Sequence, residues 1–517
     1  MSRHDDFTGL IDVAAETARF LSMAKRVEVL AHIDADGITS ASIASMALDR
    51  AGIDHSVHFI KKLDPVTIEK INLCGSDAVW LVDLGSGSYS LIEHEGACIS
   101  DHHVPNFNGQ TCLTAYFGRH MNPHLHGKDG SVEICGAGVT YLVAKMMDRR
   151  NQDLSPLAIV GAVGDFQDSS ECRLTGMNRH ILQDAEEMKL IKAFTDIRLF
   201  GRETRPLARM LQYSSDPFLP GLTGNYSNCK ETLQILGLIP ENGGSNGGTP
   251  ESDDFEGSNR RWIDLDPEEK KRLASWLCEF LLHNGLGSRA VRRLMGEVYV
   301  LPGEEKGTPL HDAKEFATLL NACGRYGKAK MGMEVCKGDR DQHLKEALRM
   351  LGSHRRYLSE SIGLLVHPTP SIVKGEVEAS STVAGNIPND SIIIIPFGKN
   401  IRYFQADERI PDTIVGIVTG MYLGSNHEIA DRPLIGMAPA QDEPGKVKVS
   451  ARGTKELVRM GLDLARAMRL ASERVGGVGG GHAIAAGATI EMGKENEFLQ
   501  EIDSIVANQL TDANREA

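Results

Sequence analysis

The stretch VEVLAHIDADGITS, residues 27–40, combines a mostly apolar run with a dense group of polar side chains. The run at 27–31 is typical of a buried strand. His32, Asp34 and Asp36 follow it at every second position and precede Gly37. Carboxylates this close together repel one another and resist burial unless a positive charge holds them. The pattern therefore predicts a metal site at the end of a strand.

Segments typical of strands alternate with segments typical of helices in this part of the chain. We expect strands at 27–31, 55–61, 78–84 and 97–100. The segment 38–52 has the small and apolar residues of a packed helix and ends at Gly52. Such alternation predicts an α/β domain with a mostly parallel sheet. Ligands of these sheets bind beyond the carboxyl ends of the strands, which is where His32, Asp83 and Asp101 fall.

The remaining patterns divide the chain into three regions. Further helices are expected at 131–148, from Ser155 onward, and at 267–284, 312–323 and 341–360. The Gly/Asn/Ser/Asp-rich stretch 241–259 is typical of a flexible loop. Strand-like runs return at 361–367, 391–397, 413–423 and 446–452, before a helix at 454–474. We therefore predict an α/β domain (1–194), a mostly helical insertion (195–355) and a smaller C-terminal α/β domain (356–517).

Bulk properties exclude several classes of protein. The 517 residues carry a net charge of −14, which argues against a generally basic DNA-coating protein but leaves room for a local cationic groove. The nine cysteines include no CxxC pair and indicate reduced thiols. The N-terminus lacks the pattern of a signal peptide, and the longest apolar run is too short to span a bilayer. These features predict a cytoplasmic protein without a membrane segment.

Four blocks in the first region offer metal ligands at expected strand or helix ends. They are HIDADG (32–37), LVDLGSG (81–87), SDHHVP (100–105) and GAVGDFQD (161–168). Each alone has a plainer explanation, because an Asp after a strand is commonly a helix N-cap and a loop HH pair is usually solvated. A calcium loop is excluded, since DADG is not followed by the remaining ligand positions. Together the blocks predict one shared site at the edge of a parallel sheet.

These four blocks resemble the signature motifs of the DHH phosphoesterase superfamily. SARGT (450–454) and GGVGGGHAIAAG (476–487) resemble the DHH-associated domain. The middle segments GRETRPL (201–207), DPFLPGLTG (216–224) and NACGRYGKAKMG (321–332) are most similar to archaeal RecJ-type nucleases. The resemblance covers nearly the whole chain and implies an active cleft between the two α/β domains.

The resemblance also implies a set of metal ligands. One ion would bind His32, Asp34 and Asp83, and a second would bind Asp36, Asp83, His102 and Asp165. Two divalent ions about 3.5–4 Å apart can hold the attacking and leaving oxygens of a phosphoryl group. Mixed histidine and carboxylate ligands suit Mn²⁺, with Mg²⁺ or Co²⁺ as alternatives, whereas structural zinc is disfavoured because no thiolate takes part.

Further roles follow from the same resemblance. His103 would contact phosphate or a leaving oxygen, and Asp101 would orient a ligand histidine. Arg452 and His482, with the glycines Gly479, Gly480 and Gly481, would bind substrate phosphates, since glycines let backbone N–H groups approach an anion. A flexible turn is the alternative explanation of the glycines. Asn321, Gly324 and Arg325 receive no role.

Four arginines, at positions 198, 202, 205 and 209, have helical spacing. On one helix they would form a cationic stripe for a nucleic-acid backbone, with Arg202 and Arg205 as the main contacts. The alternative is a solvated or salt-bridged surface, and Pro206 argues against a continuous helix. Aromatic residues make up 5% of the chain, so backbone contacts should dominate over an extended platform for base stacking.

Three functions remain open. The first is a manganese-dependent exonuclease that hydrolyses single-stranded DNA or RNA to mononucleotides, in replication or repair. The second is a phosphodiesterase or phosphatase for small substrates such as short oligoribonucleotides, a cyclic dinucleotide or adenosine bisphosphate. The third is a scaffold that docks on GINS or a replicative helicase complex. The large insertion favours the first, while polarity, DNA or RNA preference and oligomeric state stay open.

Overall fold

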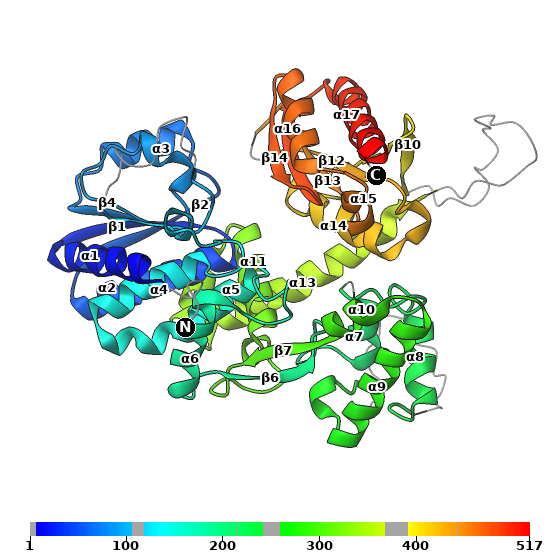
Figure 1. The fold of residues 1–517 in the computed structure, drawn as a ribbon, viewed down its shortest axis with the longest axis horizontal. Coiled ribbons are helices and arrows are strands. Elements are labelled where there is room, and N and C mark those ends of the chain that lie inside the picture. The colour runs from blue at the N-terminus through cyan, green and yellow to red at the C-terminus, as the bar shows by residue number, and fades with distance from the viewer. Residues whose placement is uncertain are drawn as a thin grey trace, which may run out of the picture. The chain divides into compact units, whose positions relative to one another are not determined.

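The computed structural model describes residues 7–105, 118–214, 216–240, 259–367, 391–441 and 443–516. The chain divides into two compact units, a first unit (Met1–Leu351) and a second unit (Gly352–Ala517) (Figure 1). The predicted loop at 241–259 lies, apart from Asn259, outside the described residues. No helix in the described ranges is long and apolar enough to cross a membrane.

The first unit is built on a parallel sheet, as the sequence predicts. Its strands are β1 (Arg26–His32), β2 (Asp54–Ile60), β3 (Ala78–Val82), β4 (Ala97–Ser100) and β5 (His120–Met121). Their order is β2-β1-β3-β4-β5, and every neighbouring pair runs parallel. The carboxyl ends of β1, β3 and β4 therefore meet at one edge, which confirms the predicted α/β class.

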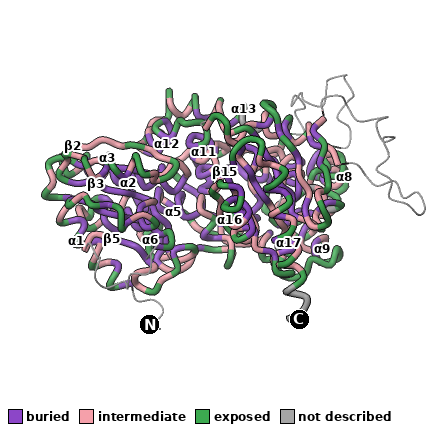
Figure 2. Tube along the Cα trace, turned by 90° about the horizontal axis from the view of Figure 1, so that it is seen from above, coloured by how far each residue is buried: buried purple, intermediate pink, exposed green. Residues whose placement is uncertain are grey.

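Helices cover one face of this sheet closely (Figure 1). Helices α1 (Thr8–Met23), α2 (Ala35–Ala51) and α4 (Gly136–Met147) contact its strands, whereas α5 (Ser155–Gly164) and α6 (Gly176–Glu187) pack on these helices. Helices α2, α4 and α5 are almost wholly buried and carry mostly small residues, which lets their backbones approach closely (Figure 2). The other face packs a smaller apolar cluster, including Leu30, Val79 and Ile71, under α3 (Pro65–Asn72).

A two-stranded antiparallel ribbon, β6 (Lys192–Ile197) and β7 (Met295–Val300), leads into and out of a helical part. This part contains α7 (Leu207–Gln212), α8 (Tyr226–Ile235), α9 (Pro267–His283) and α10 (Gly287–Leu294). These helices share a core of their own around Trp262. The following helices, α11 (Ala313–Arg325) and α12 (Ala329–Cys336), return to the core of the sheet, where Phe316 and Leu320 are buried. The predicted boundaries at 194/195 and 355/356 stay a prediction.

Helix α13 (Gln342–Leu364) belongs to both units. Its first half places Ala347 and Leu351 in the core of the first unit. Its second half packs Tyr357, Leu358 and Ile362 against the core of the second unit. A single helix therefore joins the two units.

The second unit holds a six-stranded mixed sheet of order β10-β11-β12-β13-β15-β14. The strands are β10 (Ile395–Phe397), β11 (Ile401–Gln405), β12 (Leu434–Pro439), β13 (Lys446–Arg452), β14 (Val478–His482) and β15 (Ala485–Glu491). A separate short pair joins β8 (Leu365–Val366) to β9 (Ile392–Ile393). The helices are α14 (Asp412–Ser425), α15 (Lys455–Arg459), α16 (Leu464–Arg474) and α17 (Glu495–Glu516).

Of the strands expected in this unit, the one at 413–423 is wrong, and the one at 361–367 is confirmed only at β8. Most of 361–367 continues helix α13, and 413–423 lies within helix α14. Residues 413–423 are rich in β-branched residues, which favour strands only weakly against tertiary packing. Ile414, Val415, Val418 and Tyr422 recur with helical spacing and are all buried, so the packed face decides in favour of a helix.

Candidate metal centre

Six side chains from four segments of the chain converge at the carboxyl edge of the first sheet. His32 ends β1, Asp34 is the N-cap of α2, and Asp36 lies in the first turn of that helix. Asp83 directly follows β3, His102 is the second residue after β4, and Asp165 directly follows α5. These are the six residues predicted from the sequence as metal ligands.

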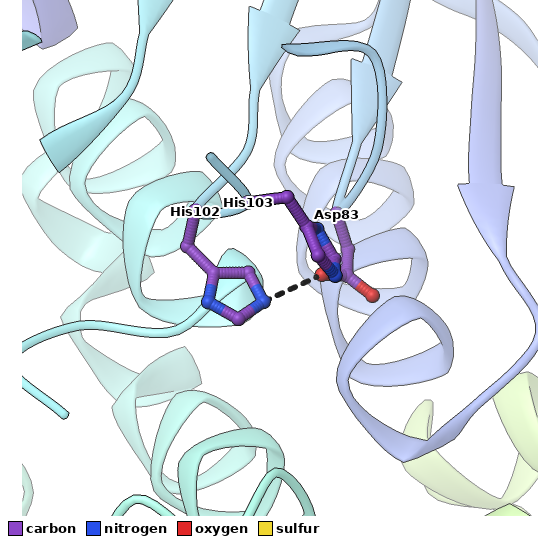
Figure 3. A group of neighbouring side chains, drawn as sticks. All are labelled: Asp83, His102 and His103. Atoms are coloured by element: carbon purple, nitrogen blue, oxygen red, sulfur yellow. Dashed lines mark ion pairs between the residues drawn. The ribbon is translucent and has the colours of Figure 1, made fainter. Parts of the chain in front are cut away.

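The donors form two groups that share Asp83. In one group, Nδ1 of His32 lies 2.9 Å from Oδ2 of Asp34 and 3.7 Å from Oδ2 of Asp83. In the other, Nε2 of His102 lies 3.3 Å from Oδ1 of Asp83, 3.6 Å from Oδ2 of Asp36 and 3.7 Å from Oδ2 of Asp165. Figure 3 shows the ion pair between His102 and Asp83, with His103 beside them. Each oxygen of Asp83 therefore faces a different group.

The burial, the free oxygens and the backbone conformation of Asp83 suit a carboxylate that binds cations. Its residue is 1% exposed, and neither carboxylate oxygen accepts a hydrogen bond in the described structure. Nδ1 of His32 is likewise buried without a hydrogen-bond partner. The backbone φ of Asp83 is 58°, a left-handed conformation that costs a non-glycine residue about 1 kcal/mol or more. Buried oxygens without hydrogen-bond partners, held in a strained backbone, fit the binding of divalent metal.

Neighbouring backbone groups fix the second ligand group. The carboxylate of Asp36 accepts hydrogen bonds from the N–H groups of Gly136 (2.6 Å) and Ala137 (2.9 Å), at the beginning of α4. A Cβ at Gly136 would lie 2.5 Å from Oδ1 of Asp83, so no side chain fits there. Nδ1 of His102 donates to the carbonyl of Gly130 at 2.7 Å. Because that carbonyl can only accept, Nε2 is left free as the ligand atom facing the carboxylates.

Asp101 has a different contact from the one predicted. Its Oδ1 lies 2.8 Å from Nδ1 of His103, the histidine not predicted as a ligand, and it does not hold the ring of His102. The Asp101 carboxylate is also fixed by the backbone N–H groups of Ser86 and His102, both at 2.8 Å. The expectation that Asp101 orients a ligand histidine is therefore corrected: it orients His103, whose side chain is 57% exposed.

The charges of the site shift its titrations strongly. The hydrogen bond that His103 donates to Asp101 raises the pKa of His103 to about 9 despite its partial burial. Burial alone would lower the pKa of His32, but the ion pairs with Asp34 and Asp83 outweigh it and raise that pKa to about 11. Burial and the charge of Asp83 raise the pKa of Asp36 to about 7. Burial also raises the pKa of Asp165, to about 6. The site thus holds excess negative charge that protons or metal ions must balance.

Helix α11 supports the ligand loop from a distant part of the sequence. The side-chain carbonyl of Asn321 accepts a hydrogen bond from the N–H of Ala35 at 2.9 Å. A Cβ at Gly324 would lie 1.7 Å from the carbonyl oxygen of Ile33, so the helix touches the loop directly. Arg325 lies at the end of α11, where the loss of solvent around its guanidinium lowers its pKa and the nearby charge of Asp34 offsets only part of that effect. No spacing or periodicity in the segment 321–332 predicts this contact, and its one sequence sign is the helical glycine at 324.

The residues predicted to bind substrate phosphates, Arg452 and His482 with the glycines before it, lie in the second unit; we call them the phosphate grip. Strand register places Arg452 of β13 and His482 of β14 on either side of Ala485 of β15. The Arg452 guanidinium lies over Gly416 of α14, where a Cβ would come within 2.6 Å of Nη2. Burial lowers its pKa, and no carboxylate within the described ranges forms an ion pair with it. His482 is exposed.

The three glycines before His482 differ in their surroundings. A Cβ at Gly479 would lie 2.7 Å from the carbonyl oxygen of Met468, and Gly481 has a φ of 140°. A Cβ at Gly480 would meet nothing within 4 Å. Packing and backbone conformation therefore explain Gly479 and Gly481, whereas Gly480 presents bare backbone to open space.

The predicted arginine stripe is wrong as a single helical face. Helix α7 begins only at Leu207, after Pro206, so Arg198, Arg202 and Arg205 all precede it. Arg202 is 3% exposed and forms ion pairs with Asp196 (2.7 Å) and Asp312 (2.8 Å). These two carboxylates neutralise its charge inside the fold, so Arg202 does not contact a phosphate backbone in this structure.

The other three arginines are also engaged. Arg198 is 8% exposed and pairs with Asp168 at 2.5 Å. The guanidinium of Arg205 lies 4.6 Å from the ring centre of Phe200 and 4.8 Å from that of Tyr213. That of Arg209 lies 4.3 Å from the ring centre of Tyr226. These residues favour the salt-bridged alternative over a continuous cationic track, and Arg205 as a substrate contact stays a prediction.

Two domain families match the chain. The DHH-CID domain matches residues 199–295, the helices between β6 and β7, and the DHHA1 domain matches residues 399–508 of the second unit. The chain therefore carries two DHH-type domains. It is also 28% identical over 493 residues to the protein MJ0831 of Methanocaldococcus jannaschii, covering 94% of each chain.

Solved structures share the fold of this chain. Exonuclease RecJ bound to manganese aligns with a TM-score of 0.52 at 17% identity, covering 99% of this chain and 97% of that one. RecJ of Thermus thermophilus in complex with Mn²⁺ aligns with a TM-score of 0.52 at 18% identity, and this chain spans 55% of its length. CDC45 of Entamoeba histolytica aligns with a TM-score of 0.57 at 13% identity, covering 97% of this chain and 98% of that one. The chain therefore has a RecJ-like fold.

Proposed function

We propose that this protein is a manganese-dependent exonuclease that hydrolyses single-stranded DNA or RNA to mononucleotides, acting in replication or repair. The observation that carries the proposal is the position of Asp83, whose two buried oxygens face two separate donor groups. That arrangement suits a pair of divalent ions acting on one phosphodiester. The RecJ-like fold favours a nucleic-acid strand as the substrate.

His32, Asp34 and Asp83 would hold one ion, and Asp36, Asp83, His102 and Asp165 the other. When bound, such a pair polarises the phosphoryl group and lowers the pKa of water at the site. Mn²⁺ suits this mixture of imidazole and carboxylate donors, and the RecJ structures that share this fold contain manganese. Mg²⁺ and Co²⁺ are the alternatives that the donor set admits.

His103 is proposed to act on the leaving group. Its hydrogen bond with Asp101 fixes Nδ1 and leaves Nε2 as the outer atom of an exposed ring. With a pKa of about 9, the ring is protonated near neutral pH and can donate to a phosphate or leaving oxygen. Arg325 adds a second exposed cation beside Asp34 for the same substrate.

Residues of the second unit are proposed to bind the phosphates of the strand end. Arg452 is a half-buried cation without a carboxylate partner in the described structure, which suits a phosphate. His482 is level with it in the sheet, and the open backbone at Gly480 lets an anion approach an N–H group.

The test is digestion of 5′- and 3′-labelled single-stranded DNA and RNA with Mn²⁺, against an EDTA control. Wild-type protein should release labelled mononucleotides, and the labelled end will report polarity. Asp83→Asn should lower kcat more than about a hundredfold, because one change removes a ligand from both ions. Asp64→Asn is the matched control, since Asp64 only caps α3 through Thr67. An Asp83→Asn variant that folds and keeps more than about a tenth of the wild-type rate would exclude a bridging role.

A replication scaffold is the second candidate. The DHH-CID match and the CDC45-like fold favour it, with GINS or a helicase complex as the partner. A folded protein that binds Mn²⁺ and GINS but releases no nucleotide from any strand would support the scaffold. Hydrolysis of dinucleotides without hydrolysis of longer strands would instead favour a small-substrate phosphodiesterase.

A further inference from the structure

An exposed aromatic ring stands next to the metal centre. Phe166 directly follows the proposed ligand Asp165, and 68% of the residue is exposed. Consecutive Cα atoms are about 3.8 Å apart, so the ring is anchored within one residue of the metal site. A large apolar side chain this exposed loses the free energy of burial, about 2 kcal/mol for a phenylalanine.

The backbone at Phe166 is strained and fixed. Its φ is 58°, the left-handed conformation that usually falls to glycine or asparagine at the end of a helix. Its N–H donates to the carbonyl of Val163 (3.1 Å), and the next N–H, of Gln167, donates to the carbonyl of Ala162 (3.0 Å). The carbonyl of Phe166 accepts from the N–H of Ser169 (3.0 Å). The ring therefore projects from a backbone held on both sides.

The inward-facing neighbours explain why the chain turns here. Gln167 is 1% exposed, and its side-chain amide donates to the carbonyl of Gly130 (2.8 Å), which also orients His102. Its side-chain oxygen accepts from Asn178 (2.6 Å). Because residue 166 is left-handed, Asp165 can be a ligand and Gln167 can hold the carbonyl of Gly130, while the side chain of Phe166 faces solvent. A glycine would make this turn without strain, so the phenyl ring needs a reason of its own.

We propose that Phe166 stacks on the nucleobase at the strand end and so positions the scissile phosphodiester against Asp165 and the other ligands. Aromatic rings in proteins that bind single strands hold bases by stacking without reading their sequence. The inference rests on the proposed exonuclease function and adds a base contact to it. It makes Phe166 a positioning residue whose effect requires a base on the terminal nucleotide.

The test compares two oligonucleotides that differ only at the terminal nucleotide, which carries either adenine or an abasic tetrahydrofuran. Wild-type protein should cleave the adenine end with a kcat/KM about 5- to 150-fold higher than the abasic end. Phe166→Ala should lose that preference, with a ratio near one, because only the cleavage of the adenine end slows. Phe166→Trp should keep or increase the preference.

Two further variants separate the ring from the backbone. Phe166→Gly relieves the left-handed strain. If the slower cleavage in Phe166→Ala comes from a disturbed turn, Phe166→Gly should cleave at the wild-type rate. If it comes from lost stacking, Phe166→Gly should cleave the adenine end as slowly as Phe166→Ala does. Phe194→Ala removes a ring that is 36% exposed on β6 and should change the cleavage of neither substrate.

The outcomes distinguish this inference from the proposed function. If wild-type protein cleaves neither oligonucleotide, the exonuclease proposal fails. If wild-type protein cleaves strands but Phe166→Ala keeps the preference for the adenine end, the stacking inference fails while the nuclease stands. If Phe166→Ala cleaves both ends equally slowly and Phe166→Gly cleaves both at the wild-type rate, residue 166 acts only through the backbone of the turn, and the stacking inference fails.

Discussion

The protons of His32 and His102 should govern metal binding. Ion pairs with Asp34 and Asp83 raise the pKa of His32 to about 11 despite its burial, and ion pairs with carboxylates raise the pKa of His102 well above its usual range. Both rings are therefore protonated at pH 7 without metal, and both must lose a proton to become ligands. Affinity for Mn²⁺ should rise with pH by about tenfold per pH unit for each proton released.

Calorimetry at pH 7 in buffers of different ionisation enthalpy measures that release. About two protons per protein should leave on Mn²⁺ binding, with an additional contribution from Asp36, whose pKa burial raises to about 7. His32→Ala should lower the count by about one, whereas His58→Ala, on the exposed part of β2, should leave it unchanged. Mn²⁺ binding without proton release would contradict the ligand roles of both histidines.

Side chains at strand ends were predictable, whereas the partners of other charged residues were not. His32, Asp83 and His102 converge because parallel strands end at one edge, which the alternation of strands and helices indicates. Their role as ligands stays a prediction. Arg202 finds Asp312, 110 residues further along the chain, and no local pattern predicts such a pair. Asp101 could hold either neighbouring histidine by spacing, and only the structure selects His103.

Arg202→Ala should therefore act on stability and not on substrate affinity. The substitution leaves Asp196 and Asp312 without their buried cation. Removing one partner of a buried ion pair lowers the free energy of unfolding by about 3–5 kcal/mol. Thermal unfolding should show a clear fall in Tm. The control Lys345→Ala breaks an exposed pair with Asp341 and should change stability by less than about 1 kcal/mol. A stable Arg202→Ala protein with weaker strand binding would restore the phosphate-track hypothesis.

At the scale of elements, helix α14 shows how packing serves the proposed grip. The sequence favoured a strand at 413–423 because periodicity in a short apolar run separates strand from helix poorly. As a helix, α14 presents Gly416 to the guanidinium of Arg452. Glycine inside a helix costs about 1 kcal/mol relative to alanine, so its presence needs this close approach as an explanation.

Gly416→Ala should consequently stabilise the fold and weaken catalysis. The added Cβ would lie 2.6 Å from Nη2 of Arg452 and would move this flexible side chain without disturbing backbone. We expect an unchanged or higher Tm together with a several-fold rise in KM for a labelled strand. Gly424→Ala, on the same helix with nothing within 4 Å of its Cβ, should show the stabilisation alone. Equal kinetics in both variants would remove Arg452 from the substrate site.

Helix α11 is the element that sequence reasoning missed. Its residues Asn321 and Gly324 meet the ligand loop at Ala35 and Ile33, far earlier in the chain. A contact across 286 residues leaves no periodic or spacing signal in a single sequence. The glycine within NACGRYG was the available sign, since a helical glycine often marks a close approach of two backbones.

At the scale of the whole molecule, the proposed reaction needs groups from both units. The metal ligands belong to the first unit, and Arg452 and His482 belong to the second. Helix α13 is continuous from one core to the other, and Gly352 lies at the division between the units. A Cβ at Gly352 would meet nothing within 4 Å, so the position tolerates other side chains.

Gly352→Pro should uncouple metal binding from strand cleavage. Proline inside a helix removes a backbone hydrogen bond and clashes with the preceding turn, at a cost of about 3 kcal/mol or more. Each unit keeps its own core, so Mn²⁺ binding by calorimetry should stay at the wild-type level. Hydrolysis of a labelled strand should fall more than about tenfold, because proline interrupts the helix that connects the unit with the metal ligands to the unit with Arg452 and His482. Gly352→Ala keeps the helix and should retain full activity. Full strand cleavage by a folded Gly352→Pro protein would mean that the second unit finds its substrate without α13, and that the helix is only a tether.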